Sequence, residues 1–339
     1  MLAKKITGYA AVAQGEALVP MSYDAPPLKE NEVRIDITHC GLCGTDVQGI
    51  DNYYGIVDYP FVPGHEIVGH ISEVGTDVSP KRLGQRVGVG WQGRACGDCE
   101  WCLQGDVHLC MDVADNGSWT PYGGFSTSVA VEDGFAYPLP EEMSSEIAAV
   151  MMCAGITAYS ALCKYCSAPG LRLGIVGIGG LGHLALQFAK AMGYEVTALS
   201  SSLHKREEAL SLGAENFIAV SDQAALARVA DYFDLLYVTA HGGVAWEAMM
   251  GSLKRKGKLL LSGFPDLSLD SVDLVAHELS IEGSFLGTQQ DMRDMLHFTQ
   301  AHAIEPMLEL MPMSQVNQAI KKLKQNKVHY RIVLVNDLI

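Results

Sequence analysis

The sequence predicts an α/β protein whose first half is rich in β-strands and whose second half is a parallel α/β domain. Three observations lead to this prediction. A chain of 339 residues is longer than one ordinary hydrophobic core, so two domains are expected. Short β-branched runs separated by glycine and proline fill the first half. Strand-like and helix-like segments alternate after Ser144.

The first half predicts an irregular β-rich unit, in which short strands are joined by turns. The clearest strand patterns are EVRIDIT (32–38), EIVGHISEVG (66–75), RVGVGW (86–91) and FSTSVAV (125–131). The residue pattern then changes: in segment 141–162 the apolar residues have the spacing typical of a helix.

The second half predicts a doubly wound parallel sheet, because strands and helices alternate along it. A strand at 171–176 leads through a glycine turn into a helix at 184–193, and a second strand begins at Glu195. A helix is expected at 204–214, with strands at 216–220, 233–239, 257–264 and 278–287. The end of the chain predicts a helix (289–303), a strand, a helix (313–326) and a final strand (330–335).

Composition and charge restrict the class of protein. The formal net charge of -15 argues against nucleic acid as a partner, because nucleic-acid binding needs clustered lysine and arginine. Residues 1–20 lack the continuous apolar core of a signal peptide, and the apolar run Ile147–Cys163 is short for a membrane span. We therefore expect a cytoplasmic protein without a membrane partner. In that compartment clustered cysteines indicate metal or catalysis and not disulfides.

Four of the nine cysteines lie in the loop CGDCEWCLQGDVHLC, spaced C-x2-C-x2-C-x7-C. A structural zinc ion takes four ligands in a tetrahedron, and closely spaced thiolates on a tight loop supply them. The loop therefore predicts a structural zinc site made of Cys96, Cys99, Cys102 and Cys110. An iron–sulfur cluster, which also needs closely spaced cysteines, is the alternative.

A second set of metal ligands is dispersed along the chain. CGLCGTD (40–46), PGHEIVG (63–69) and MMCAGITAY (151–159) are weak motifs when taken one by one. Together they offer Cys43, His65 and Cys153. Two thiolates and an imidazole are a known ligand set for a catalytic zinc ion with an open fourth position. Cys40 shares its motif with Cys43, and only one of the two is expected to bind.

The segment GIVGIGGLGH predicts a dinucleotide-binding turn. Gly177, Gly179 and Gly182 form G-x-G-x-x-G between an apolar strand and an amphipathic helix, with a second strand beyond. Together with Gly180 and Leu181, they allow a tight turn and a close approach of the backbone to a pyrophosphate at the helix N-terminus. A Rossmann domain is therefore expected. An ordinary tight turn between strand and helix is the alternative.

The end of the second strand bears on the choice of cofactor. A carboxylate is expected there when the ribose 2′-hydroxyl is bound. The residues at that position carry hydroxyls or basic side chains instead: Ser200, Ser201, Ser202, His204, Lys205 and Arg206. Hydroxyls with a nearby cation favour a 2′-phosphate, and hence NADP(H) over NAD(H). The alternative is that the serines cap the next helix.

Taken together, the motifs resemble those of zinc-dependent medium-chain alcohol dehydrogenases, in particular the cinnamyl alcohol dehydrogenase-like branch. The resemblance spans essentially the whole chain. It is carried by KKITGYAAVAQGEALVP, CGLCGTD, PGHEIVGHI, the four-cysteine loop, YGGFS, CAGITAY, GIGGLGH, SSSLHKREEALSLGA, GSFLG and HYRIVLV. It implies a GroES-like catalytic domain at 1–152, completed by 285–339, and a Rossmann NADP-binding domain at 153–284.

The resemblance also implies roles for residues around the metal. Cys43, His65 and Cys153 are expected to bind a catalytic zinc ion, and Glu66 is the nearby carboxylate that can approach it. With the four-cysteine loop this makes two zinc ions per chain. Thr45 takes the position of the hydroxyl that touches the substrate oxygen and passes its proton.

For the cofactor, the resemblance implies that Thr157 lies near the nicotinamide and that Arg331 contacts the pyrophosphate. Ser201, Ser202 and Lys205 fall where this branch holds the 2′-phosphate of NADP(H). The implied partners are a small-molecule alcohol or aldehyde, and a second copy of the chain in a homodimer.

Two positions depart from the family pattern. Gln48 stands where a histidine often ends the proton relay, and Gly44 where a basic residue or histidine often follows the ligand cysteine. The expected reaction is hydride transfer between NADP(H) and a primary alcohol or aldehyde, running as reduction of aromatic or broad-range aldehydes. Alternatives are a zinc dehydrogenase of another alcohol or polyol with NAD(H), a zinc-free quinone-type reductase, and an NADP-binding sensor without turnover.

Overall fold

The computed structural model describes residues 4–112, 122–165 and 170–338. The chain forms two compact units. The first comprises Met1–Cys153, Thr288–Ala301 and Pro306–Ile339, and the second Ala154–Gly287 with His302–Glu305. The first unit is therefore discontinuous in sequence. The domain limits expected from the sequence, at 152/153 and 284/285, stay a prediction.

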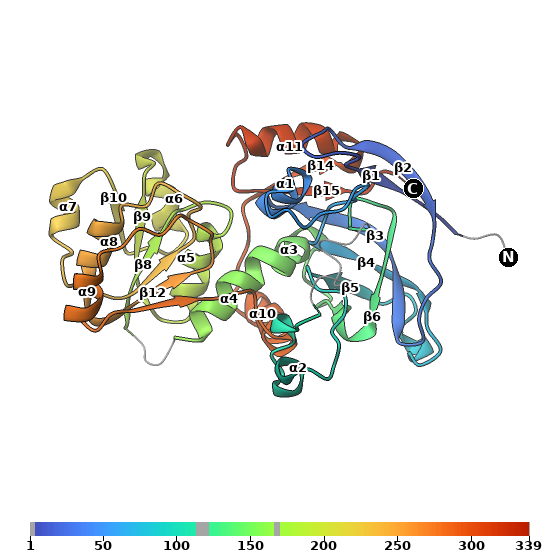
Figure 1. Ribbon diagram of the computed structural model, residues 1–339, viewed down its shortest axis with the longest axis horizontal. Helices are drawn as coiled ribbons and strands as arrows, with labels where there is room; N and C mark the ends of the chain where they lie inside the picture. Colours follow the sequence, from blue (N-terminus) through green and yellow to red (C-terminus); the bar gives the residue numbers. More distant parts are fainter. Residues whose placement is uncertain (1–3, 113–121, 166–169, 339) are drawn as a thin grey trace. The chain divides into compact units, whose positions relative to one another are not determined.

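The first unit is built around one long strand, β3 (Glu32–Leu42). β3 pairs with β4 (Ile67–Val74) along one edge, and with β6 (Ser128–Glu132) and β15 (Arg331–Val335) along the other. The strands follow the order β14-β15-β3-β4-β5-β7, with β6 beside β3. Because β15 lies next to β3, the end of the chain completes a sheet begun by its N-terminal half (Figure 1).

The remaining strands of this unit are short: β1 (Lys5–Ala10), β2 (Val19–Asp24), β5 (Arg86–Val89), β7 (Tyr137–Pro138) and β14 (Leu308–Pro312). Strands β1 and β2 form a separate two-stranded sheet. The helices are α1 (Gly44–Ile50), η1 (Pro80–Arg82), α2 (Glu100–Gln104), η2 (Val107–Leu109), η4 (Asp133–Phe135), α3 (Ser145–Val150), α10 (Gln289–Ala301), η7 (Met313–Gln315) and α11 (Val316–Lys324).

Alternation along the strands builds the core of the first unit. Val33, Ile35 and Ile37 occupy every second position of β3 and are completely buried. They join one core cluster with Ile71 of β4 and Val87 of β5. The strands expected at 32–38, 66–75, 86–91 and 125–131 are thus present as β3 to β6, because period-two burial is what their sequences encode.

The second unit is a sheet of six parallel strands in the order β10-β9-β8-β11-β12-β13. The strands are β8 (Arg172–Val176), β9 (Glu195–Ser200), β10 (Asn216–Ala219), β11 (Phe233–Val238), β12 (Leu253–Leu261) and β13 (Ser280–Gly283). Numbered within this unit, the order is 3-2-1-4-5-6, which is the topology of a Rossmann domain. The order reverses at β8, so the glycine turn that follows β8 lies at the switch point where such sheets bind ligands.

Helices accompany the parallel strands: α4 (Ile156–Cys163), α5 (Gly182–Ala191), η6 (Leu203–Lys205), α6 (Arg206–Ser211), α7 (Gln223–Ala227), α8 (Trp246–Ser252) and α9 (Ser271–Ala276). In Figure 1, α5 lies on one side of the strands, and α8 and α9 lie on the other. Helices on both faces make a doubly wound sheet, as expected from the sequence.

Residues Ser145–Cys163 form one apolar helical stretch, in which a π-helical turn, η5 (Met151–Gly155), joins α3 to α4. Its most apolar window has a mean hydropathy of 1.6, and 72% of that window is buried in the protein. Length and composition alone would let such a helix cross a membrane, but the core helix of a globular protein has the same properties. It is the one such stretch in the described part of the chain.

Several element limits differ from those expected. The helix at 141–162 is interrupted by η5, and the helix at 204–214 is shortened to η6 and α6. The strand at 278–287 is only β13, because Glu278 (φ 50°) and Leu286 (φ 49°) adopt a left-handed backbone that cannot continue a strand.

Candidate metal centres and cofactor site

Four ligand side chains meet in the first unit. A ligand atom from each of Cys43, His65, Glu66 and Cys153 lies within 4.8 Å of those of the others. Cys43 follows β3 and precedes α1, His65 and Glu66 precede β4, and Cys153 lies in the π-helical turn η5. π-Helical turns often mark functional sites. The structure thus brings together the dispersed residues that the sequence indicated as ligands.

His65 is oriented by Asp46, a residue of α1. Nδ1 of His65 lies 2.9 Å from Oδ1 of Asp46, and both side chains are buried. Burial alone would lower the pKa of His65, but the Asp46 carboxylate and its hydrogen bond raise it well above the usual value. A histidine held through Nδ1 keeps Nε2 for a metal, and carboxylate–histidine pairs of this kind support metal ligands in many proteins.

Cys43, and not Cys40, is the thiol of its motif that joins the cluster. Cys40 is completely buried in the core cluster, and burial raises the pKa of its thiol well above the usual value. A hydrogen bond from Cys153, together with His65, holds the pKa of Cys43 well below its usual value. The thiolate is the form of cysteine that binds a metal, and the lowered pKa of Cys43 favours this form.

Glu66 is completely buried and accepts a hydrogen bond through Oε1 from Nη2 of Arg331. Burial raises the pKa of Glu66 to about 7, although the Arg331 charge opposes the shift. Its second oxygen, Oε2, has no hydrogen-bond partner among the described residues. Gly41 makes room for it, because a Cβ there would lie 1.9 Å from Oε2. A buried orphan oxygen beside two thiolates and an imidazole fits a cation.

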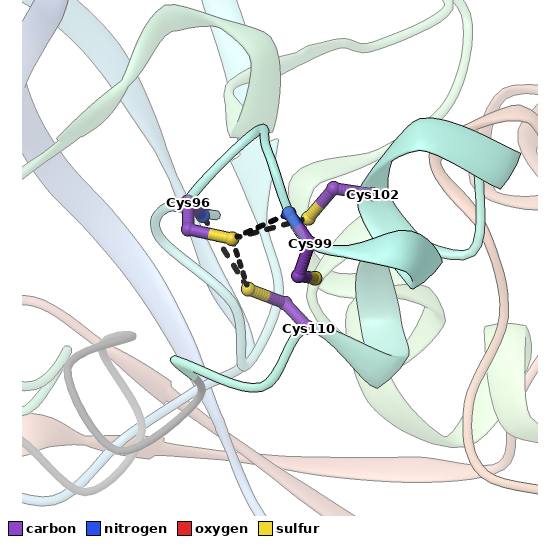
Figure 2. A group of neighbouring side chains, drawn as sticks. All are labelled: Cys96, Cys99, Cys102 and Cys110. Carbon is purple, nitrogen blue, oxygen red and sulfur yellow. Dashed lines mark hydrogen bonds between the residues drawn. The ribbon is translucent and has the colours of Figure 1, made fainter.

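The four thiols of the loop form a second cluster (Figure 2). The Sγ of Cys96 lies 3.5 Å from that of Cys110 and 3.8 Å from that of Cys102. The four cysteines are free thiols and not disulfides. A tetrahedron with zinc–sulfur bonds of about 2.3 Å has sulfur–sulfur edges of about 3.8 Å, so the cage fits one such ion. An iron–sulfur cluster, which places several irons between its thiolates, needs wider spacing.

Backbone amides face the sulfurs of this cage. The amide of Cys96 lies 3.3 Å from Sγ of Cys110, and that of Cys99 lies 3.4 Å from Sγ of Cys96. Hydrogen bonds from the backbone of Met111 and Cys102 lower the pKa of Cys99 to about 6. A hydrogen bond with Asp98 raises the pKa of Cys96 to about 12, and burial raises the pKa of Cys102, so these contacts favour the thiolate at Cys99 and not at every sulfur of the cage.

The glycine turn of the second unit has the shape expected for a pyrophosphate cradle. Gly177 follows β8 with φ 95°, a conformation that glycine adopts without strain. A Cβ on Gly182 would lie 2.0 Å from the carbonyl oxygen of Gly177, so helix and strand approach closely only because this residue is glycine. A Cβ on Gly179 would meet nothing within 4 Å, which leaves that backbone open to a ligand. Leu181 caps α5, and Gly180 precedes it.

The serine run lies at the end of β9, beside this turn. Ser200 is buried, and its Oγ accepts a hydrogen bond from the amide of Ser202 at 3.1 Å. Ser201 is exposed. The Nζ of Lys205 donates to the carbonyl of Ile178 in the glycine turn at 2.6 Å, and burial lowers the pKa of Lys205. One cation thus connects the serine run with the glycine turn, and no carboxylate ends β9.

Comparison with known proteins identifies the family. Residues 29–141 match the alcohol dehydrogenase GroES-like domain, and residues 180–301 match the zinc-binding dehydrogenase domain. Cinnamyl alcohol dehydrogenase 5 of Arabidopsis thaliana is 39% identical over 342 residues, with 98% of this chain and 96% of the relative covered. The chain belongs to the zinc-dependent medium-chain alcohol dehydrogenases. An NADP-dependent alcohol dehydrogenase (C 1) of Mycolicibacterium smegmatis is 33% identical over 339 residues, covering 97% of each chain.

Solved structures place this alcohol dehydrogenase in the same branch. A cinnamyl alcohol dehydrogenase from Sorghum bicolor superposes with a TM-score of 0.91 at 36% identity, covering 98% of each chain. These relatives confirm the cinnamyl alcohol dehydrogenase-like resemblance and the GroES-like plus Rossmann fold. As a member of the family, the protein acts on small-molecule alcohols or aldehydes.

One residue of this alcohol dehydrogenase site and one side-chain contact beside it were not predicted from the sequence. Asp46, three positions after Cys43 in CGTD, was not assigned a role, although an acidic residue in the first turn of α1 was a signal. Tyr54 donates a hydrogen bond through its hydroxyl to Oε1 of Gln48 at 3.1 Å. No local pattern signals this contact, because it depends on how the loop after α1 folds back.

The other residues predicted for the cofactor lie in different parts of the fold. Thr157 is half-buried in α4, and its carbonyl accepts a hydrogen bond from the hydroxyl of Tyr237 at 3.2 Å. Arg331 begins β15 and contacts Glu66 in the first unit. Their roles at the nicotinamide and the pyrophosphate stay predictions.

Proposed function

We propose that this alcohol dehydrogenase uses NADP(H) to reduce aldehydes, aromatic or of broad range, to primary alcohols. One observation carries the proposal: Cys43, His65 and Cys153, distant in sequence, bring their ligand atoms within 4.8 Å of one another. Two thiolates and an imidazole bind a zinc ion and leave one position open for a substrate oxygen. Glu66 is the carboxylate that approaches this site.

When bound, the zinc ion supplies Lewis acidity and the nicotinamide supplies the hydride. The residues of the chain bind and orient these groups. Asp46 fixes the ring of His65, and Arg331 fixes the carboxylate of Glu66. Because these four side chains are buried, water screens their charges little. The side chains also need little reorientation during the reaction.

Thr45 moves the proton in this proposal. Its Oγ1 lies 3.6 Å from Sγ of Cys43, next to the proposed metal position. In aldehyde reduction the Thr45 hydroxyl would give its proton to the substrate oxygen, and it would regain a proton from water. Gln48 cannot titrate, so it takes part only as a hydrogen-bonding group.

The preference for NADP(H) is supported by the groups at the end of β9. Ser201 and Ser202 offer hydroxyls, and the Lys205 cation lies against the glycine turn. A 2′-phosphate gains charge-assisted hydrogen bonds from such groups, whereas NAD(H) offers them only a hydroxyl. The turn of Gly177, Gly179, Gly180, Leu181 and Gly182 would hold the pyrophosphate.

The four-cysteine loop is proposed as a structural zinc site, which makes two zinc ions per chain. Four thiolates fill a tetrahedron and leave no position for a substrate. This site therefore contributes stability and not chemistry.

A homodimer is proposed as the assembly. β13 is an edge strand of the parallel sheet, and Val272 and Val275 of α9 expose 65% and 75% of their surface. An unpaired strand edge with exposed apolar neighbours favours a second copy. Light scattering after gel filtration should give twice the chain mass. A single-chain mass at micromolar concentration would reject the dimer.

The experiment that tests the function is a cofactor-oxidation screen. The zinc-loaded protein is assayed with NADPH and with NADH against benzaldehyde, cinnamaldehyde and short aliphatic aldehydes, with His65→Ala as the control. We expect oxidation of NADPH that the control lacks. Turnover with NADH alone would favour the NAD(H) alternative, and cofactor binding without turnover would favour a sensor.

A further inference from the structure

Gln92 is a buried side chain at the neck of the four-cysteine loop, by which we mean the place where the segments that contain Arg94 and Val107 come together. It lies just after β5, shortly before Cys96, and only 6% of its surface is exposed. Its side-chain nitrogen, Nε2, donates to the carbonyl of Val107 at 2.7 Å and to that of Arg94 at 3.2 Å. Arg94 lies on the limb that enters the loop, and Val107 lies on the limb that leaves it. One buried amide therefore joins the two limbs.

The entering limb is itself fixed to the sheet. Glu132 at the end of β6 donates its amide to the carbonyl of Gly93 at 2.8 Å. The side chain of Glu132 accepts the amide of Ala95 through Oε2 at 3.4 Å. The backbone on both sides of Arg94 is thus held by one residue of a strand. Gln92 extends this anchorage to the leaving limb through Val107.

The two limbs lead to the cysteines that close the cage. Cys96 follows the entering limb and Cys110 follows the leaving limb, and their sulfurs lie 3.5 Å apart. The other two sulfurs belong to Cys99, which caps the N-terminus of α2, and to Cys102, which lies within α2. Opening the neck would separate Cys110 from Cys96. A four-thiolate site tolerates little of this, because its bonds are close to 2.3 Å.

We propose that Gln92 is a positioning residue for the structural metal, which closes the neck of the loop and thereby slows release of the ion. The inference rests on the structural zinc site proposed above. A thiolate that leaves the metal remains within reach while the neck is closed, so it rebinds before the ion escapes. Groups that orient metal ligands typically change metal affinity by about 10–100-fold.

The test compares zinc release from the parent, Gln92→Met and Gln104→Met, each loaded with zinc and mixed with excess chelator and a metallochromic indicator. Methionine matches the length and volume of glutamine but donates no hydrogen bond. Gln104 is an exposed glutamine on α2 of the same loop, so its substitution is the matched control. Gln92→Glu is the second variant, since it keeps the shape of glutamine and sets carboxylate oxygens against the two carbonyls.

We expect Gln92→Met and Gln92→Glu to release one of two zinc equivalents at least about tenfold faster than the parent, with the second equivalent unchanged. Gln104→Met should match the parent. Unchanged release from both Gln92 variants, even with a lower melting temperature, would show that Gln92 only packs, and would overturn this inference alone. A parent whose loop takes up no zinc would overturn the structural metal site itself, and this inference with it.

Discussion

Asp46 holds two of the proposed zinc ligands at once. Its Oδ1 lies 2.9 Å from Nδ1 of His65, and its Oδ2 accepts the backbone amide of Cys43 at 2.8 Å. Oδ1 also accepts the amide of Gly64 at 3.0 Å. The position of an imidazole and that of a thiol from a different segment are therefore both set by one buried carboxylate.

Substituting Asp46→Asn tests this relationship. Asparagine keeps the shape but carries no charge and has one acceptor oxygen in place of two, so His65 and Cys43 cannot both be held. We expect a loss of about 10–100-fold in kcat/KM or in affinity for the catalytic zinc. The control is Asp51→Asn, which removes a carboxylate just after α1 that is 41% exposed and pairs with Lys324. An exposed pair contributes about 0–1 kcal/mol, so this control should remain close to the parent. Equal activity of the two variants would show that Asp46 does not orient the ligands.

The two metal sites should respond differently to loss of a ligand. His65→Ala should abolish turnover while the protein stays folded, because the proposed catalytic site loses one of three ligands. Cys99→Ser should mainly lower thermal stability, because the loop loses its four-thiolate cage. Elemental analysis should find two zinc ions in the parent and one in each variant. Swapped phenotypes would mean that the roles of the sites are exchanged, and iron in place of zinc would reject both assignments.

Charge at the end of β9 should control the choice of cofactor. Ser201→Asp places a carboxylate where the 2′-phosphate is proposed to bind, so NADPH is repelled while NADH is not. We expect the ratio of kcat/KM for NADPH over NADH to fall at least about tenfold, which corresponds to about 1.4 kcal/mol. Ser211→Asp, on the exposed end of α6, adds the same charge elsewhere in the second unit and should leave the ratio unchanged. A parent enzyme that uses both cofactors equally well would remove the phosphate site.

Gln48 should support the site without carrying the proton. We expect Gln48→Ala to retain most of the activity, because glutamine cannot titrate and Thr45 has other routes to solvent. Gln48→His should introduce or shift an inflection near pH 6.5 in the rate profile, the ordinary pKa of imidazole. A deuterated cofactor is needed to show that hydride transfer limits the rate. If Gln48→Ala is as inactive as Thr45→Ala, glutamine belongs to the relay.

Tyr54 donates a hydrogen bond to Gln48, so the two side chains can be tested together by comparing the single variants with the double variant. Tyr54→Phe removes the hydroxyl that lies 3.1 Å from Oε1 of Gln48 and keeps the ring. We expect Tyr54→Phe and Gln48→Ala to have small effects on kcat/KM that do not add in the double variant, since both remove the same bond. Additive effects would show that the two side chains act independently.

Features that are encoded locally could be predicted from the sequence. The parallel unit follows from alternating strand and helix patterns, and the glycine turn after β8 follows from the spacing of the glycines between Gly177 and Gly182. The four-thiol cage was predictable for the same reason, because Cys96 to Cys110 are close in sequence and the chain only has to fold back on itself. The two ends of strand β13 could not be predicted from the sequence, because the backbone conformations at Glu278 and Leu286 depend on their surroundings.

Which side chains meet at the dispersed site depends on how the strands pair in the folded protein. Cys40 and Cys43 share a motif, but Cys40 lies within β3 and faces the core, whereas Cys43 lies beyond the strand where the chain turns into α1. The contact of Glu66 with Arg331 requires β15, from the end of the chain, to pair with β3. Such contacts come from strand pairing over long sequence separations. No local pattern records them, because the burial that fixes each partner is created by the fold as a whole.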